Sequence, residues 1–125
     1  MKPNRATLIA ALVVVAMVTA LRAADPSGRW SASFTTEVGE QQYTFEFVVK
    51  GSSLTGTIKG NLTGESKIAD GKVDGDTLSF VENGSYDGMP LRIAYSGTMT
   101  SADEIAFTRT VADAFMEKLV AKRVK

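Results

Sequence analysis

Residues 43–58 read YTFEFVVKGSSLTGTI, and this stretch decides the fold class of the protein. Apolar side chains occupy every second position from Tyr43 to Val49, a Gly-Ser-Ser segment follows, and the alternation resumes at Leu54. Successive side chains of a β-strand point to opposite faces, so a period of two predicts strands with one apolar face. The stretch therefore predicts two antiparallel strands joined by a short turn.

The same alternation extends in both directions from this hairpin, beginning at Trp30. Clusters of Gly, Asn, Asp and Ser interrupt it at intervals typical of an all-β sandwich or barrel. The spacing within Val111–Val120 also fits a helix, but we interpret it as a loop and a strand. The eight expected antiparallel strands are Arg29–Thr36, Gln42–Lys50, Leu54–Gly60, Lys67–Val73, Thr77–Glu82, Leu91–Thr100, Glu104–Val111 and Lys118–Val124.

Turns of two kinds separate these strands. Similar segments recur at Lys50–Thr57, Val73–Phe80 and Thr100–Phe107, each with a short turn before a strand. In an up-and-down meander such turns all lie at one end of the sheet, so we expect one tight end and one open end. The longer connections, at the open end, are Val38–Gln41, Asn61–Ser66, Asn83–Pro90 and Ala112–Glu117.

Two details refine the expected fourth strand and the turn that follows it. Asp74-Gly75 favours a tight hairpin turn, because this pair accepts positive backbone angles, and Gly71 indicates a β-bulge. The spacing of acidic residues here resembles part of a calcium-binding loop, but Lys72 stands at a ligand position. We therefore expect no metal site.

One face of the expected strands is apolar and the opposite face is mostly Ser, Thr, Glu, Lys and Arg. Eight sequential antiparallel strands with one apolar face can close as a barrel or as a two-layer sandwich. A barrel also leaves no exposed edge strands. The apolar face comprises Trp30, Ala32, Phe34, Tyr43, Phe45, Phe47, Val49, Leu54, Gly56, Ile58, Leu78, Phe80, Leu91, Ile93, Tyr95, Met99, Ile105, Phe107, Leu119 and Ala121.

The N-terminal segment has the pattern of a secretory signal peptide. Lys2 and Arg5 precede the uncharged, largely apolar stretch Leu8–Leu21, which is shorter than the roughly 20 residues of a membrane span. We expect residues 1–23 to be removed, leaving a domain of residues 24–125. Because the chain has no Cys and hence no disulfide, this export pattern favours a bacterial periplasm or the cell exterior.

The charge balance limits the partners that we expect. The chain carries 14 basic and 14 acidic residues. Removing residues 1–23 takes away Lys2, Arg5 and Arg22, which leaves 11 basic and 14 acidic residues, a net charge of −3. The sequence contains no cluster of Lys and Arg residues that could neutralise phosphate groups, so we expect neither nucleic acid nor an anionic membrane as a partner. The sequence does not indicate whether the protein forms a homo-oligomer.

The absence of His and Cys from the sequence removes the imidazole base and the thiolate nucleophile used by most hydrolases. A Ser or Thr nucleophile would need Lys as its base, and no motif singles out such a pair. We therefore expect no enzymatic activity and no cofactor.

Three residues carry a resemblance to a known family. Gly28-Arg29-Trp30 opens the first strand as a Gly-x-Trp motif, and Arg123 ends the last strand. Closing an even-stranded meander places these two ends side by side, so Trp30 and Arg123 should form a cation–π pair. The chain resembles the calycin superfamily of lipocalins and fatty-acid-binding proteins, in which a basic side chain covers a Trp at the closed end. It lacks the length, second signature and C-terminal helix of lipocalins and the helical lid of fatty-acid-binding proteins, and is more similar to small secreted bacterial barrels of unknown function.

Four residues are candidate ligand contacts. Glu82 lies two positions after Phe80, and Arg109 lies two positions after Phe107, so both side chains are expected to face the same inward side as these phenylalanines (inward parity). Both lie near the open rim. Together with Tyr43 and Tyr95 they could orient a ligand in an apolar cavity. Alternatively, because unpaired buried charges are costly, Glu82 and Arg109 project into water at the mouth or pair with each other.

Four apolar side chains are expected in the two longest open-end loops: Tyr86 and Met89 in one, Phe115 and Met116 in the other. They could form a lid, a partner surface or a plug for the barrel. The leading hypothesis is an exported, non-catalytic protein that binds a small apolar or amphipathic molecule. The alternatives are an interaction module with a filled barrel, and a sugar-binding accessory protein that stacks a sugar on Trp30 or Tyr86.

Overall fold

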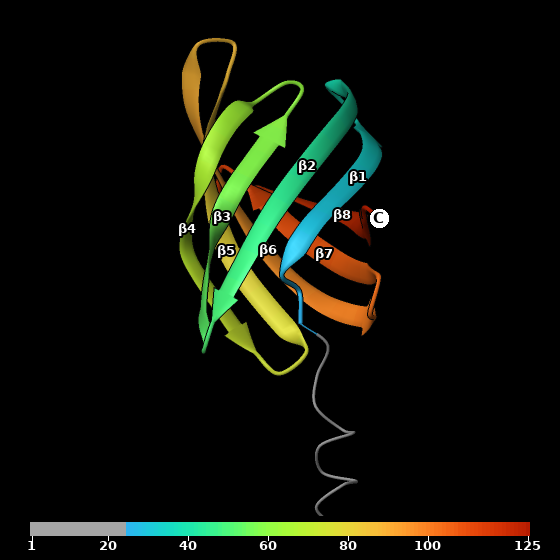
Figure 1. Cartoon of the computed structure of the whole chain (residues 1–125). Helices are drawn as coiled ribbons and strands as arrows, with labels where there is room; N and C mark the ends of the chain where they lie inside the picture. The colour runs from blue at the N-terminus through green and yellow to red at the C-terminus, as the bar shows by residue number, and fades with distance from the viewer. Residues whose placement is uncertain (1–24) are drawn as a thin grey trace, which may run out of the picture.

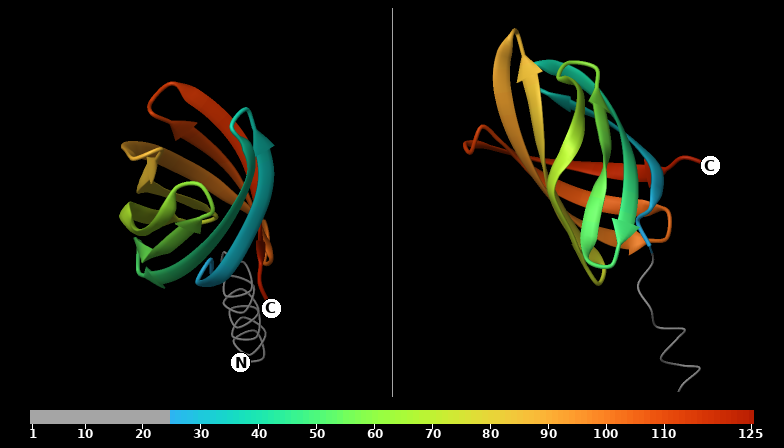
Figure 2. Two further views of the ribbon diagram at one scale, coloured as in Figure 1. Left: turned by 90° about the horizontal axis from the view of Figure 1, so that it is seen from above. Right: turned by 60° about the vertical axis from the view of Figure 1, so that its left-hand side comes forward.

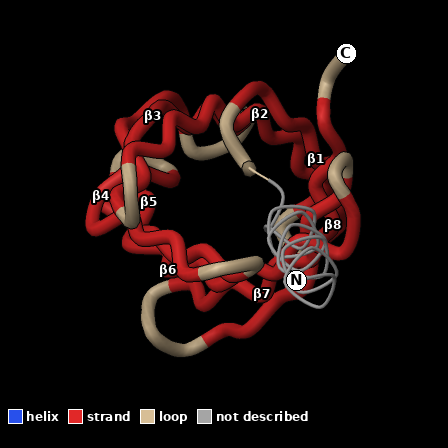
Figure 3. Tube along the Cα trace, turned by 60° about the horizontal axis from the view of Figure 1, so that its bottom comes forward, coloured by secondary structure: helices blue, strands red, loops and turns tan. Residues whose placement is uncertain are grey.

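The computed structural model describes residues 25–125, which form a closed barrel of eight antiparallel strands (Figure 1). The strands follow one another in chain order around the ring, and the last pairs with the first (Figure 3). No helix in this part of the chain is long and apolar enough to cross a membrane. The strands are β1 (Gly28–Thr36), β2 (Gly39–Lys50), β3 (Ser53–Gly60), β4 (Gly64–Asp74), β5 (Thr77–Tyr86), β6 (Met89–Ser101), β7 (Glu104–Val111) and β8 (Phe115–Arg123).

All eight expected strands are present, and the closure is a barrel rather than a sandwich. The expected turn at Asp74-Gly75 is also confirmed, with Gly75 at φ 60°. The bulge predicted at Gly71 is confirmed by a register shift between Ala69 and Lys72, where Asp70 has φ 52°. The expected signal peptide, residues 1–23, lies outside the described residues.

The connections at the open end are shorter than predicted, and the prediction of a loop over Asn83–Pro90 is wrong. β5 continues to Tyr86 and β6 begins at Met89, with only Asp87 and Gly88 between them. Both of these residues have positive φ, 51° and 77°, and an Asp-Gly pair in this conformation lets two strands pair up to the tip of the hairpin. This hairpin rises beyond the other strands, at the upper left of Figure 1.

The closed end is sealed by the predicted Trp30–Arg123 pair. The guanidinium carbon of Arg123 lies 4.4 Å from the centre of the Trp30 ring system, and the two residues are register partners. Arg123 also donates hydrogen bonds to the backbone carbonyls of Asp25, Ser27 and Ala102. The Trp30 indole N–H donates to the carbonyl of Pro26 at 2.8 Å. One arginine thus ties the start of the domain to β8 and to the β6–β7 turn.

Aromatic rings fill the half of the barrel nearest the closed end. Phe45 is fully buried, and its ring centre lies 5.6–6.0 Å from those of five other aromatic side chains. Rings at these spacings stabilise a core beyond the effect of area burial alone. The five rings belong to Tyr43, Phe47, Phe80, Tyr95 and Phe107.

The barrel closes through a short seam. β1 and β8 form two register pairs, Trp30–Arg123 and Ser31–Lys122, both near the closed end. Beyond Ser31 the two strands have no further register pairs, and the view from above shows the β1–β2 and β7–β8 turns apart (Figure 2, left). The open end is therefore wider on this side than a fully paired seam would allow.

Candidate functional site

A layer of seven polar side chains crosses the barrel between the aromatic core and the open end. Three of them are direct neighbours across β6, β7 and β8, because Tyr95 pairs with Arg109 and Arg109 pairs with Glu117. Inward parity on adjacent strands is thus sufficient to bring these three together. The polar layer comprises Gln41, Tyr43, Thr63, Glu82, Tyr95, Arg109 and Glu117.

Glu82 is completely buried and is surrounded by hydroxyl groups. The Tyr95 hydroxyl donates to Oε1 at 2.8 Å, and the Thr63 hydroxyl donates to Oε2 at 2.8 Å. The Tyr43 hydroxyl lies 3.1 Å from Oε2 and 2.8 Å from the Thr63 hydroxyl. These hydrogen bonds compensate for the hydration that the carboxyl group loses on burial.

Arg109 is 98% buried and is held from three sides. Its Nε donates to Glu117 at 2.7 Å, one terminal nitrogen donates to the Tyr95 hydroxyl, and the other donates to Oε1 of Gln41. The guanidinium carbon also lies 4.7 Å from the ring centre of Phe34. Arg109 therefore has an anion, two neutral acceptors and an aromatic face as neighbours, which is what a buried cation requires.

The structure corrects one alternative for Glu82 and Arg109, since neither projects into water at the mouth. Nor, among the ion pairs of residues 25–125, does any join the two directly. Instead the Tyr95 hydroxyl accepts from Arg109 and donates to Glu82. The four candidate residues, Tyr43, Glu82, Tyr95 and Arg109, thus form one connected network.

Burial and neighbouring groups shift the pKa values of three members of this network, Tyr43, Tyr95 and Arg109. Loss of hydration, together with the neighbouring Glu82, raises the pKa of Tyr95 well above 10.0 and also raises the pKa of Tyr43. Burial by itself lowers the pKa of Arg109, but Tyr95, Tyr43 and Glu117 outweigh this effect and raise it. At neutral pH both phenols therefore keep their protons and Arg109 keeps its charge.

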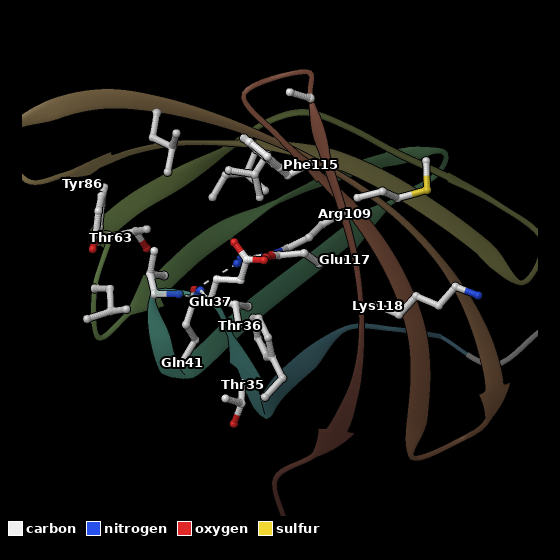
Figure 4. Close-up of a pocket in the computed structure, with 18 residues that line it drawn as sticks. Thr35, Thr36, Glu37, Gln41, Thr63, Tyr86, Arg109, Phe115, Glu117 and Lys118 are labelled. Atoms are coloured by element: carbon white, nitrogen blue, oxygen red, sulfur yellow. Dashed lines mark hydrogen bonds and ion pairs between the residues drawn. The ribbon is translucent and has the colours of Figure 1, made fainter.

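A pocket of about 940 Å³ opens above the polar layer, at the open end of the barrel (Figure 4). It lies where β1 and β8 diverge, because the ends of both strands contribute to its walls. Arg109 and Glu117 point toward each other at its floor, and Gln41 and Thr63 also contribute polar atoms. The apolar walls are formed by Phe34, Val38, Leu62, Tyr86, Leu91, Ile93, Val111, Ala114, Phe115 and Met116.

Three of the four apolar residues expected in open-end loops line this pocket: Tyr86, Phe115 and Met116. The expectation that they lie in loops is wrong, since Tyr86 ends β5, Met89 begins β6, and Phe115 and Met116 begin β8. The turn before β8 is shorter than predicted because Ala112 and Asp113 adopt positive φ. These side chains are therefore held on paired strands rather than on mobile lids.

Sequence reasoning missed three members of the polar layer: Gln41, Thr63 and Glu117. Gln41 and Glu117 share inward parity with Tyr43 and Leu119, a signal that could have identified both. Thr63 could not have been found in this way, because it lies in the turn between β3 and β4 and folds back over the barrel interior.

Two glycines make room for Thr63. A Cβ atom at Gly60 would collide with the side chains of Thr63 and Tyr43. One at Gly84 would lie 3.1 Å from Glu82 Oε2 and 3.2 Å from Thr63 Cβ. The hydroxyl that completes the Glu82 site therefore depends on small residues in two separate strands.

Other candidates are placed away from the pocket. Trp30 is completely buried at the closed end, so its ring offers no stacking surface for a sugar. Within residues 25–125, no three His, Cys, Asp or Glu side chains gather where they could bind a metal ion.

Comparisons of the chain with protein-family models, with curated proteins and with solved structures found no match.

Proposed function

We propose that this protein is an exported, non-catalytic carrier that binds a small apolar or amphipathic molecule in the open-end pocket. The observation that carries the proposal is a pocket of about 940 Å³ with mainly apolar walls and a polar floor. Small-molecule sites typically measure roughly 300–1,000 Å³ and combine apolar walls with a few placed polar groups.

The strand pairing beneath the walls supports this proposal. Val111, Phe115 and Ile93 lie on neighbouring strands in continuous register, so strand pairing sets the backbone positions of these three wall residues. A preformed cavity lowers the entropic cost of binding. The apolar area that a ligand would bury supplies roughly 25 cal/mol per Å².

A non-catalytic role is favoured by the state of the polar side chains. Glu82 and Arg109 are each held by several hydrogen bonds inside the barrel. The sequence has no His or Cys to supply a base or a thiolate. These groups are better suited to holding the barrel and the pocket floor in place than to transferring protons to a substrate.

We further propose that the barrel is calycin-like. The support is the combination of Gly28 and Trp30 at the start of β1 with Arg123 stacked on the indole from the end of β8. Fold likeness is weak support for function, so the carrier proposal rests on the pocket.

The export part of the proposal rests on the sequence of residues 1–23, with Leu8–Leu21 as its apolar stretch. It is tested by expressing the full chain in a bacterium and measuring the mass of the protein in the periplasm and medium. A mass lacking about the first 23 residues supports export. Full-length protein retained in the cytoplasm contradicts it.

The carrier role is tested by native mass spectrometry of the purified mature chain, with organic extraction of any retained molecule. A stoichiometric adduct supports the proposal and identifies the ligand class. Titration with a dye that fluoresces in apolar surroundings provides a second readout. A bare mass together with no dye response would contradict the carrier role.

Two matched tryptophan variants locate the binding site. Val111→Trp fills the pocket from its wall, whereas Val48→Trp adds the same ring to the exposed outer face of β2. We expect the first variant to abolish dye binding and the second to retain it. Equal dye binding by both would place the bound dye elsewhere.

An interaction module is the second candidate, favoured by the apolar side chains exposed around the mouth. Phe115 and Met116 are 65% and 73% exposed, and Met89 is 67% exposed at the hairpin tip. Exposed apolar side chains at one end of a molecule are candidates for a partner surface. This candidate predicts no small-molecule adduct and, for self-association, a clean multiple of the chain mass.

A further inference from the structure

The charged groups at the pocket floor cancel one another, and this limits the ligand that the proposed carrier can take. The floor is formed by the ion pair between Arg109 and Glu117, whose Nε and Oε1 atoms lie 2.7 Å apart. Glu117 is 24% exposed, whereas Arg109 is 2% exposed. A ligand entering from the mouth therefore meets a neutralised pair rather than a free positive charge.

Arg109 offers little to an anionic head group, because its side chain is only 2% exposed. Each of its three side-chain nitrogens already donates one hydrogen bond, to Glu117, Tyr95 or Gln41. Its flat face is covered by Phe34 at 4.7 Å. A ligand carboxylate would have to displace Glu117, which the register of β7 and β8 holds directly opposite Arg109.

An ionic head of either sign gains little at this floor. A carboxylate placed near Arg109 is also near Glu117, and an ammonium placed near Glu117 is also near Arg109. Each ion would lose its hydration while attraction to one partner is offset by repulsion from the other. At the rim the exposed side chains Glu37 and Lys118 carry opposite charges, which are screened by water and salt.

An uncharged head group meets no such penalty. The Glu117 carboxylate can accept a hydrogen bond, and the Thr36 hydroxyl and Gln41 amide lie on the same pocket lining. A hydroxyl head can both donate and accept there. The aliphatic side chains Leu62, Leu91 and Val111 suit a hydrocarbon tail.

We propose that the pocket selects an uncharged amphiphile, a hydrocarbon chain with a hydroxyl head, over the corresponding carboxylate or ammonium. This inference rests on the proposed carrier function. It makes Glu117 the residue that determines specificity, because Glu117 neutralises the one cation at the floor.

The test compares three probes with the same chain: dodecanol, dodecanoate and dodecylammonium, each used to displace the apolar dye from the mature protein at neutral pH. We expect dodecanol to displace the dye at a concentration about tenfold lower than either ion. Displacement by either ion at an equal or lower concentration overturns the inference and leaves the carrier function standing. Failure of all three probes to bind overturns both.

Glu117→Gln tests the role assigned to this side chain. The substitution leaves Arg109 without its anionic partner, so we expect the affinity for dodecanoate relative to dodecanol to rise about tenfold. Glu46→Gln is the matched control, since it breaks the exposed Arg29–Glu46 pair on the outer wall at 2.8 Å. An unchanged ratio in Glu117→Gln, or an equal rise in Glu46→Gln, contradicts the specificity role.

Discussion

The two halves of the barrel are built from the same strands but filled differently. Near the closed end, Phe45 and its aromatic neighbours occupy the interior, and Arg123 seals the base over Trp30. Near the open end, the strands enclose a pocket of about 940 Å³. A small barrel can thus pack one half with aromatic side chains and keep a pocket in the other half. The polar layer is the boundary between them.

The largest expected effect lies in the filled half. Phe45→Ala removes the ring that packs against five aromatic side chains and leaves a cavity among them. We expect the free energy of unfolding to fall by about 3–5 kcal/mol. Urea denaturation followed by the fluorescence of Trp30, the single tryptophan, measures this change. A loss below about 1 kcal/mol would show that this half is not tightly packed.

A substitution in the polar layer should lower the free energy of unfolding less than Phe45→Ala does. Tyr95→Phe removes the hydroxyl that accepts from Arg109 and donates to Glu82, leaving a buried donor and a buried acceptor each with one partner fewer. We expect a destabilisation of about 1–3 kcal/mol. The same urea experiment checks it, and a stability equal to that of the wild type would mean that water replaces the lost hydroxyl.

The tyrosines of this layer also predict a dependence on alkaline pH. Burial, reinforced by Glu82, raises the pKa of Tyr95 and Tyr43 in the folded protein above 10.0, while the unfolded chain loses these protons near that value. Unfolding therefore releases protons above pH 10.0, and stability falls as the pH rises, by up to about 1.4 kcal/mol per pH unit for each tyrosine. Well below pH 10.0, Tyr95 and Tyr43 are protonated in both the folded and the unfolded state, so they do not make the stability depend on pH.

Urea denaturation at a series of alkaline pH values measures this slope in the wild type and in Tyr95→Phe. The variant should lose at least half of the tyrosine contribution, because the pKa of Tyr95 is raised further than that of Tyr43. Identical slopes in the two proteins would exclude Tyr95 as a source of the alkaline sensitivity.

The cation–π contact between Arg123 and Trp30 at the closed end is expected to contribute about 1 kcal/mol to the free energy of unfolding. Arg123→Met keeps an apolar chain over Trp30 but removes the guanidinium. With it go the hydrogen bonds to the carbonyls of Asp25, Ser27 and Ala102 and the ion pair with Asp103. Stability should fall modestly, and the emission of Trp30 should shift as its cover changes. Unchanged emission would indicate that the methionine covers the ring equally well.

The smallest effect is expected in the open half. Phe115→Ser removes a ring of the same size as that of Phe45, but this ring is largely exposed at the pocket wall. We expect stability to change by no more than about 0.5 kcal/mol. A loss comparable to that of Phe45→Ala would remove the contrast between the halves.

Much of the fold could be predicted from local patterns. Alternation predicts which side chains face inward, and this prediction is correct for Phe45, Glu82 and Arg109. Alternation left open whether the two charged side chains project into water at the mouth, and the structure shows that both are buried. The Gly-x-Trp motif and Arg123 indicated how the two chain ends meet. The strand ends at the open side were less predictable, because the Asp87-Gly88 turn allows pairing to continue beyond the expected loop boundary.

By itself the sequence determined eight strands and their inward faces, because these follow from a period of two. Closure of the even meander as a barrel then brings Trp30 to Arg123. Only the tertiary structure decided that Thr63 folds back onto Glu82, that Glu117 neutralises Arg109, and that β1 and β8 diverge over a pocket. The physical reason is that these contacts join residues from separate elements of the chain. Alternation of apolar and polar residues is a local property of each strand, whereas a pocket depends on how strands from both ends of the chain meet.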